Sequence, residues 1–303
     1  MKRRVQKRFK RKSPPEPRRF WKYSALILIC PLLWGFNHAP SEHGFHDPLK
    51  TRSQRLVEHL SQEVNGLEVS VYFKDLNSGM SFGINEEKKF PHGSLGKLPY
   101  LMGILKSAEN DPGLLAQTVK LRPTAIVELA QSGPAEQSYT VERLLWRLIV
   151  RSDNAALLAL STAVPPALLL KAYQDLAVEY GTSGELSAKE YSRFLEALAR
   201  HDYLNSLFSE KALNLLTLTE FRSGLVEGVP GSIRVAHKWG SVGEPLSQLL
   251  HDCGIVYYPN HPYLICIMTR ARADSGVLSS VIARISRQVY DDFSERLSAI
   301  NVD

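Results

Sequence analysis

Apolar and polar positions follow two different periods along residues 50–298, the stretch that can build a folded domain. Between residues 50 and 64 apolar side chains recur every third or fourth position, as in a helix with one buried face. From 67 to 73 apolar and polar residues alternate, and turn-forming residues at 75–79 lead to a second strand at 80–84. The domain is therefore predicted to begin with a helix and a β-hairpin.

The middle of the chain, from residue 94 to about 230, reads as almost wholly helical. Ser187 and Glu190 form a capping box at the start of one helix, whereas Thr140 begins another with Arg143 at the position where a capping box has Glu. The helices predicted here begin at Ser94 and after Thr140 and then cover 155–160, 167–180, 187–199 and 209–218.

The pattern changes back to strands after residue 231. Three strands and a closing helix are predicted, at 235–241, 253–258, 263–269 and about 274–297. This order predicts an α+β fold, an antiparallel five-stranded sheet flanked by terminal helices, with an all-helical lobe inserted between its second and third strands.

Positive charge is concentrated at the start of the chain. Residues 1–22 hold 11 of the 37 Lys and Arg residues and, in Glu16, one of the 31 acids, a net charge of +10. The remaining 26 basic and 30 acidic residues give −4, so the basic isoelectric point belongs to this tail. A nucleic-acid-binding role would rest on the tail alone, and the acidic remainder argues against it.

A mostly apolar stretch at residues 20–36 overlaps the end of the tail. Its length is at the short end of what spans a bilayer, and a basic flank before a short apolar core is typical of an export signal or signal anchor. Because no clean cleavage site follows, we expect a retained single-pass anchor in the cell membrane. The positive-inside rule then makes residues 1–22 a cytoplasmic tail, 37–49 an external linker and 50–298 an extracytoplasmic domain.

The first candidate for chemistry is the pair Ser94 and Lys97. At the start of a predicted helix, residues three apart lie on one face. A serine hydroxyl is a poor nucleophile until a base takes its proton, and a lysine whose pKa is lowered by burial can be that base. Taken alone, the pair also fits a capping serine and a solvated lysine.

Two further motifs follow, Ser152-Asp153-Asn154 and Lys238-Trp239-Gly240. Ser152 and Lys238 can form a hydroxyl–ammonium pair that hands on a proton. A lysine beside a glycine on a strand leaves room for an extended substrate to lie along that strand. Alone, the first motif fits a helix stop in which Asp153 bonds to backbone, and Lys238 fits an exposed charge on a strand.

In this order the three motifs make the chain resemble the class A β-lactamase and penicillin-binding protein superfamily over roughly residues 50–298. The resemblance implies that Ser94 is the acylated nucleophile and Lys97 a base for it. It implies that Ser152 relays a proton to the leaving nitrogen and that Lys238 offers positive charge to Ser152 and to a substrate carboxylate.

The resemblance also implies a substrate-binding set. Asn154 would bond the side-chain amide of the substrate, and Trp239, Gly240 and Ser241 would line the strand along which it lies. The backbone N–H groups of Ser94 and Ser241 would form the oxyanion hole. The substrate would be a D-alanyl cell-wall peptide or a β-lactam, with no cofactor.

Two departures from the family pattern stand out. Trp239 has no hydroxyl for a substrate carboxylate, although Ser241 could partly substitute. The loop glutamate with which class A β-lactamases activate the deacylating water has no counterpart in sequence, because neither Glu179 nor Glu185 has the Glu-x-x-Leu-Asn context. Slow hydrolysis of the acyl-enzyme, as in a penicillin-binding protein, is expected.

No metal site is expected, because no Cys or His cluster has metal-ligand spacing. Cys253 and Cys266 fall in neighbouring predicted strands. They could be oxidised outside the cell, but we expect two small buried thiols.

Two hypotheses about function remain open at this point. The first is a membrane-anchored extracytoplasmic serine acyl hydrolase, which the three motifs favour. The second is a β-lactamase-like module that binds or senses cell-wall peptide or β-lactam without cleaving it, which Trp239 and the absent loop glutamate favour. Loss of turnover on replacing Ser94 would distinguish them.

Overall fold

The computed structural model describes residues 48–121, 137–179, 184–244 and 246–300. The predicted tail (1–22) and membrane anchor (20–36) lie outside these residues, as does most of the predicted linker (37–49), whose last two residues already belong to α1 (Pro48–Glu63). In the described part of the chain, no helix is both long enough and apolar enough to cross a membrane.

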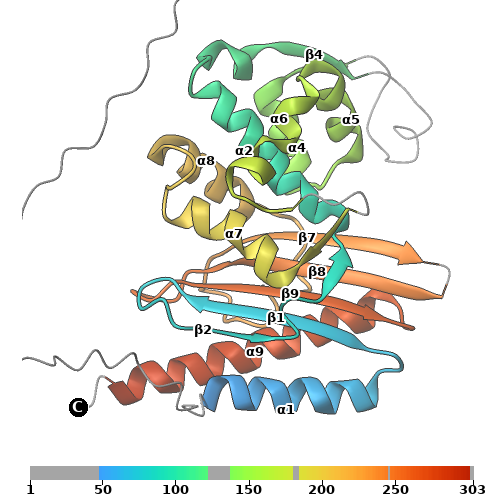
Figure 1. Cartoon of the computed structure of the whole chain (residues 1–303), viewed down its shortest axis with the longest axis vertical. Helices are drawn as coiled ribbons and strands as arrows, with labels where there is room; N and C mark the ends of the chain where they lie inside the picture. The colour runs from blue at the N-terminus through green and yellow to red at the C-terminus, as the bar shows by residue number, and fades with distance from the viewer. Residues whose placement is uncertain (1–47, 122–136, 180–183, 245, 301–303) are drawn as a thin grey trace, which may run out of the picture. The chain divides into compact units, whose positions relative to one another are not determined.

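Five antiparallel strands form the central sheet in the order β2-β1-β9-β8-β7, which confirms the predicted fold class (Figure 1). They are β1 (Glu68–Asp75), β2 (Ser81–Ile84), β7 (Val235–Glu244), β8 (Ser247–Val256) and β9 (Tyr263–Ala271). The first strand of the chain, β1, pairs with the last, β9, and Val71 lies opposite Ile267. β8 begins six residues before its predicted start. Residues 247–252 consist of two polar residues, two leucines and two polar residues, so they show no alternation, and hydrogen bonds to the strands on both sides hold them in the sheet.

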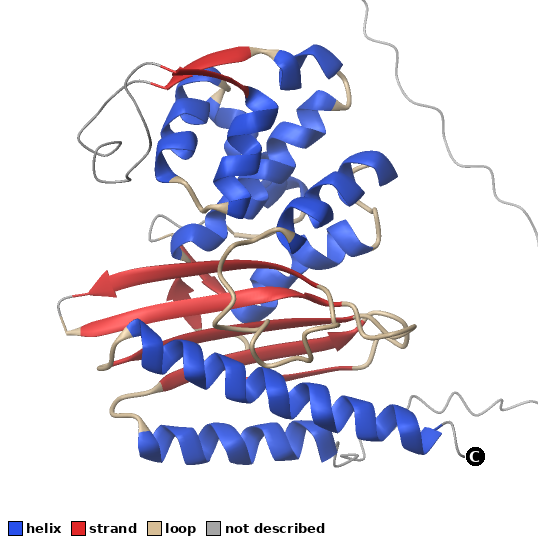
Figure 2. Cartoon of the chain, turned by 180° about the vertical axis from the view of Figure 1, so that it is seen from behind, coloured by secondary structure: helices blue, strands red, loops and turns tan. Residues whose placement is uncertain are grey.

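The terminal helices α1 and α9 (Ser275–Ile300) lie side by side on one face of the sheet (Figures 1 and 2). Apolar side chains from both helices and from the strands form one core cluster between them. Phe73, Tyr263 and Phe293 are at its centre, with ring centroids 5.2–5.5 Å apart. Arg52 of α1 also pairs with the buried Asp292 of α9 at 2.7 Å.

The helical lobe lies on the opposite face of the sheet (Figure 1). Its helices are α2 (Lys97–Ala108), α4 (Val141–Val150), α5 (Asn154–Ala163), α6 (Pro166–Asp175), α7 (Ala188–Ala199) and α8 (Ser206–Thr217). A second apolar cluster joins them to the sheet. The capping box of Ser187 and Glu190 begins α7 as predicted, and Thr140 caps α4 through its bond from the Arg143 N–H.

The lobe is not all helical, which corrects the sequence prediction. Two short ladders cross it: β3 (Lys89–Pro91) pairs with β6 (Glu185–Ser187), and β4 (Thr118–Leu121) pairs with β5 (Gln137–Thr140). Strands of three or four residues carry too few alternating positions to be recognised, and their pairing partners are distant in sequence.

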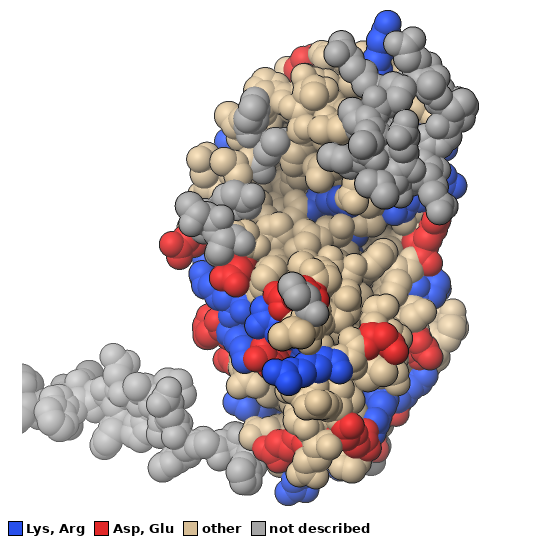
Figure 3. Space-filling model, turned by 90° about the vertical axis from the view of Figure 1, so that its right-hand side faces the viewer, with Lys and Arg blue, Asp and Glu red and all other residues tan. Residues whose placement is uncertain are grey.

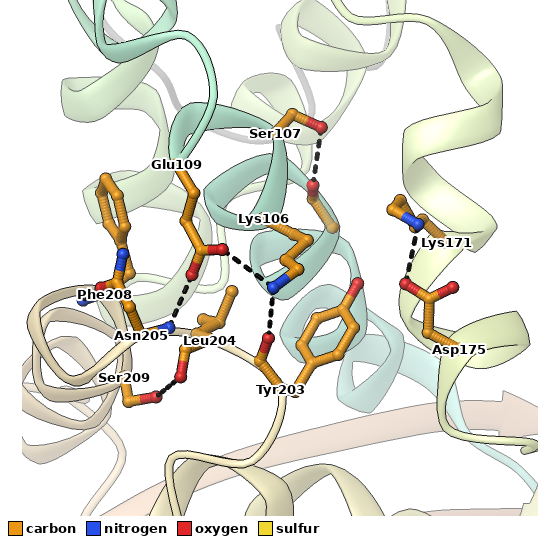
Figure 4. Close-up of polar contacts among 11 residues, drawn as sticks. Lys106, Ser107, Glu109, Lys171, Asp175, Tyr203, Leu204, Asn205, Phe208 and Ser209 are labelled. Carbon is orange, nitrogen blue, oxygen red and sulfur yellow. Dashed lines mark hydrogen bonds and ion pairs between the residues drawn. The ribbon is translucent and has the colours of Figure 1, made fainter.

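Helix α2 runs through the middle of the lobe, and ten of its twelve residues are buried. Pro99 lies in its first turn, where a missing N–H breaks no helical hydrogen bond. The C-terminal end is tied to the start of α8, because the Lys106 ammonium donates to Glu109 at 2.8 Å and to the Tyr203 carbonyl at 2.7 Å (Figure 4). Glu109 in turn accepts the Asn205 N–H at 2.6 Å (Figure 4).

Cys253 of β8 and Cys266 of β9 form a disulfide, which corrects the expectation of two free thiols. The two residues stand directly opposite each other in the ladder, with Cα atoms 3.9 Å apart. Facing cross-strand positions bring two cysteine side chains within bonding reach, and sequence alone does not fix that register.

Candidate active site

Ser94 lies in a short 3₁₀ helix, η1 (Gly93–Gly96), between β3 and α2. The helix predicted to begin at Ser94 begins instead at Lys97, with Gly96 as its cap, so Ser94 is not the capping serine of the alternative reading. The Ser94 hydroxyl is therefore not used to begin a helix. It is half-buried at the N-terminal end of the central helix of the lobe.

The backbone of β7 lies directly against this turn. A Cβ atom built on Gly240 would stand 2.8 Å from the His92 carbonyl oxygen and 3.0 Å from the Ser94 nitrogen. A Cβ on Gly93, whose φ is +51°, would stand 2.8 Å from the Ser241 carbonyl oxygen. Only glycine permits both approaches, so the two glycines bring the backbone of β7 at Gly240 and Ser241 close against the Ser94 turn.

The hydroxyl of Ser152 lies between two lysines. Lys238 Nζ is 3.0 Å and Lys97 Nζ is 3.2 Å from Ser152 Oγ. Lys97 also donates to Asn154 Oδ1 at 2.7 Å and to the Ser152 carbonyl. With both lone pairs of Ser152 Oγ used by ammonium donors, its own hydrogen is free to point to a third group.

The expected bond between Lys97 and Ser94 is absent, since within the described ranges the Ser94 hydroxyl has no hydrogen bond. Lys97 bonds instead to the Ser152 loop. Catalytic hydrogen bonds of this kind often close only when substrate is bound. The fold thus brings Ser94, Lys97, Ser152, Asn154 and Lys238 to one place.

Burial lowers the pKa of both lysines. The pKa of Lys238, which is fully buried, falls to about 7, first because of desolvation and then because of the neighbouring Lys97 charge. Desolvation lowers the pKa of Lys97 to about 8, against the attraction of Asp153. With a pKa of about 8, Lys97 reaches the neutral form that a general base for a serine hydroxyl needs at a pH much closer to neutrality than an exposed lysine does.

Ser152 owes its position to the junction of α4 and α5. It has a φ of +54°, a conformation that non-glycine residues rarely adopt. Asp153 holds this junction, because it accepts the Ala155 N–H at 2.8 Å and pairs with Arg147 at 2.6 Å. The predicted structural role of Asp153 is confirmed.

Trp239 follows Lys238 on β7, and its ring stacks on Phe221 with centroids 4.7 Å apart. Phe221 precedes β7 in a loop, and no local motif in the sequence marks it. Ser241 is exposed on the same strand.

A buried histidine that the sequence did not single out holds the strand that leads into the Ser94 turn. His251 of β8 donates from Nε2 to the Pro91 carbonyl at 3.0 Å and accepts the Thr269 N–H at Nδ1. Burial lowers its pKa to about 4, so the ring is neutral in this tautomer. A second buried pair, His237 of β7 and Asp252 of β8 at 2.7 Å, links these two strands, and Asp252 also accepts the Leu225 N–H of the loop that carries Phe221.

Glu179 and Glu185, the two glutamates compared with the loop glutamate of the family, do not contact the Ser94 site. Glu179 is 81% exposed and pairs with Lys89 at 3.7 Å. Glu185 belongs to β6, opposite Pro91. Neither bonds to Ser94 or Lys97, and among the residues described, no group of acidic, His and Cys side chains could hold a metal ion.

The side of the molecule seen in Figure 3 is hollowed between the helical lobe above and the sheet layers below. Lys and Arg atoms are visible inside this depression, among neutral atoms (Figure 3). Basic groups therefore lie recessed between the two layers rather than only on the outer surface.

The comparisons agree with this geometry. Residues 48–293 match the family model Beta-lactamase2, described as the beta-lactamase enzyme family, and no curated protein matches the chain. The structure of PBP-A is similar, with 22% identity, a TM-score of 0.71 and coverage of 82% of this chain and 97% of that one.

Two further solved structures are similar in fold. One is an acyl-enzyme complex of a PBP-A mutant with penicillin G, at 22% identity, with a TM-score of 0.69 and coverage of 82% and 97% of the two chains. The other is a class A beta-lactamase from Bacteroides cellulosilyticus DSM 14838, at 16% identity, with a TM-score of 0.70 and coverage of 82% and 99%. Since its family model spans most of the chain, this protein belongs to the beta-lactamase enzyme family, as a serine hydrolase with the class A β-lactamase and penicillin-binding protein fold.

Proposed function

We propose that this protein is a membrane-anchored extracytoplasmic serine acyl hydrolase that forms an acyl-enzyme at Ser94. Its substrates are amides of the β-lactam or D-alanyl cell-wall peptide type. The observation that carries the proposal is the Ser152 hydroxyl between two buried lysines, at 3.0 and 3.2 Å, next to the Ser94 turn. The PBP-A mutant of the same fold, in its acyl-enzyme complex with penicillin G, supports the choice of ligand.

The first step follows from these positions. Ser94 Oγ bonds to the carbonyl carbon, and neutral Lys97 takes the hydroxyl proton. The negative oxygen that develops is stabilised by the N–H groups of Ser94 and Ser241. Ser152 gives its proton to the leaving nitrogen as the C–N bond breaks, and the lysines restore that proton.

Water then attacks the carbonyl carbon of the Ser94 ester. The bond to Ser94 Oγ breaks, the acid leaves, and a proton of the water restores the Ser94 hydroxyl. Glu179 is exposed and pairs with Lys89, Glu185 pairs in β6, and neither has the sequence context of the loop glutamate that would activate this water. We therefore expect the acyl-enzyme to be long-lived, as in a penicillin-binding protein.

The test is the intact mass of the full chain in detergent, followed over time with benzylpenicillin, with Ser94→Ala as the control. A stable adduct that the variant lacks supports an acylating enzyme with slow deacylation. Consumption of the drug without a lasting adduct would indicate a fast β-lactamase. Binding without adduct or consumption would favour the binding module instead.

Membrane anchoring is proposed from sequence alone, from the basic flank and the apolar residues 20–36. The test is protease treatment of intact cells that express the full chain. Loss of the domain with retention of a short cell-associated fragment supports an external domain on a retained anchor. A domain that resists protease until the cells are opened would contradict it.

A further inference from the structure

A cavity lies between helices α4 and α8, and none of the residues placed at the Ser94 site lines it. Its volume is about 620 Å³, within the range of about 300–1,000 Å³ that is typical of small-molecule sites. Apolar side chains from three helices line it, namely Leu105 of α2, Leu145 and Trp146 of α4, and Phe208 and Leu215 of α8. The cavity therefore has the size and the lining of a ligand site.

The two helices are joined to each other on both sides of this cavity. Near the start of α4, Glu142 pairs with Lys211 of α8, and both residues line the cavity. At the end of α4, the Val150 carbonyl accepts the Glu220 N–H at 3.1 Å, and Arg151 pairs with Glu220 at 3.1 Å. The helix rises about 12 Å between Glu142 and Val150, which is about the diameter of one helix with its side chains. A small molecule fits between these two bridges better than a partner helix does.

The start of α8 is fixed by bonds that need no ligand. The Phe208 N–H donates to Asn205 Oδ1 at 3.0 Å, and the Asn205 N–H donates to Glu109 at the end of α2 (Figure 4). Lys106 in turn holds Glu109 at 2.8 Å (Figure 4). The wall formed by Phe208 thus belongs to the fold, and a ligand would not bear the cost of ordering it.

Two leucines of α8 and the residues after it expose apolar surface to solvent where they line the cavity. Leu207 is 74% exposed and Leu218 is 56% exposed. Among the residues that the structure describes, Leu170 and Leu246 are the other large apolar side chains with comparable exposure. Exposed leucines beside a concave apolar surface are typical of a binding site.

The charges around the cavity favour an anionic ligand. Glu142 is used by its ion pair with α8, and Glu210 accepts a hydrogen bond from His201 at 3.2 Å. Arg143 also lines the cavity and is exposed, and its guanidinium lies 4.2 Å from the centroid of the Trp146 ring. Within the described ranges, no carboxylate pairs with Arg143. A carboxylate on the ligand would supply that partner, through a charge-assisted hydrogen bond.

We propose that this cavity is a second binding site, for a small organic carboxylate with an apolar or aromatic body. The body packs between Leu207 and Leu218 onto Leu215, and the carboxylate pairs with Arg143. The site is separate from the acyl transfer proposed at Ser94 and does not depend on it.

The test is photolabelling of the full chain in detergent with 4-benzoylbenzoate and with its neutral amide, which share one benzophenone body. Tryptic digestion and mass spectrometry locate the adducts, and the probe concentration at half-maximal labelling is measured. We expect adducts in the peptides 144–147, 201–211 and 212–222. The carboxylate should reach half-maximal labelling at about a tenth of the concentration that the amide needs. Arg143→Gln should make the two concentrations equal, whereas Arg143→Lys should keep part of the difference.

Two leucine variants test where the body packs. Leu207→Ser removes exposed apolar surface from the cavity and should raise the half-maximal concentration of both probes about fivefold. Leu246→Ser is the matched control, because Leu246 is 79% exposed and lies outside the cavity, and it should change neither concentration.

Ser94→Ala should be labelled like the wild type, since the cavity does not include the Ser94 site. Loss of the adducts in Ser94→Ala, or adducts only in other peptides, would overturn the inference. Equal half-maximal concentrations of carboxylate and amide in the wild type would also overturn it, as would equal effects of Leu207→Ser and Leu246→Ser.

Discussion

At the residue scale, this site is built by placing ordinary groups in unusual surroundings. Desolvation lowers the pKa of Lys97 to about 8 against the attraction of Asp153, and desolvation together with the charge of Lys97 lowers the pKa of Lys238 to about 7. Ser152 accepts from both lysines because its backbone takes a φ of +54°. The sequence named all three residues, and only folding gave them their surroundings.

The pH dependence of acylation should report these lysines. Lys97 must be neutral to take the Ser94 proton, so the second-order rate constant for acylation should rise with pH, with an apparent pKa of the pair between about 7 and about 8. Stopped-flow or mass-detected acylation by a neutral activated ester measures it. A flat profile, or a rise only near about pH 10 as for an exposed lysine, would contradict the assignment of Lys97 as the base.

Gly240 is a second test at this scale. In Gly240→Ala the new Cβ would lie 2.8 Å from the His92 carbonyl and the Leu95 nitrogen, so the Ser94 turn must move away from β7. We expect acylation to slow by about a hundredfold, as when an oxyanion donor is lost. Gly243→Ala is the matched control on the same strand, because its nearest neighbour is 3.6 Å away. Equal acylation rates for Gly240→Ala and Gly243→Ala would show that β7 does not lie this close to the Ser94 turn.

At the scale of elements, α2 determines where the nucleophile stands. The helix carries Lys97 at its start and is fixed at its end by Lys106 and Glu109 (Figure 4). Its periodic apolar residues predicted a helix, but its burial follows from packing against α4, α6 and α8, which only the tertiary structure brings beside it. The two short ladders were missed for the same reason, since pairing with distant segments holds them.

The crossing of α2 and α6 gives an element-scale prediction. A Cβ on Gly103 would lie 1.9 Å from the Leu168 carbonyl oxygen. Gly103→Ala should lower the free energy of unfolding by about 1–3 kcal/mol, although alanine favours helix. Denaturant unfolding measures it, with Gly231→Ala as control, because nothing lies within 4 Å of a Cβ there. A Gly103→Ala variant as stable as the wild type would show that α6 can move aside.

At the scale of the whole molecule, β8 and β9 hold the layers together, and the Cys253–Cys266 disulfide joins them behind Lys238, which stands opposite Cys253. With the cysteines 13 positions apart, the double variant Cys253→Ala/Cys266→Ala should lose about 3 kcal/mol of unfolding free energy by the chain-entropy relation. Denaturant unfolding with and without reductant measures the loss. If reductant lowers the free energy of unfolding of the double variant as much as that of the wild type, the disulfide is not the cause of the loss.

Acid stability is a further whole-molecule property. Burial lowers the pKa of His251 to about 4, whereas the unfolded chain binds that proton near pH 6.5. The unfolded state therefore binds more protons between these values, and stability should fall as pH falls through this window, by up to about 3 kcal/mol. In His251→Asn this part of the loss should disappear. If the free energy of unfolding falls equally with pH for the wild type and for His251→Asn between pH 6.5 and about 4, the prediction is wrong.

The sequence by itself determined the fold class, the order of the elements and the residues Ser94, Lys97, Ser152 and Lys238, because periodicity and short motifs are local properties of a chain. It also predicted Asp153 as a structural residue, correctly. It did not determine the disulfide, the buried His251 or the stacking of Trp239 on Phe221. Those depend on strand register and on which distant segment lies beside which, and long-range packing alone decides them. The lysine pKa values, and with them the chemistry, belong to that second class, because desolvation exists only once the layers have closed.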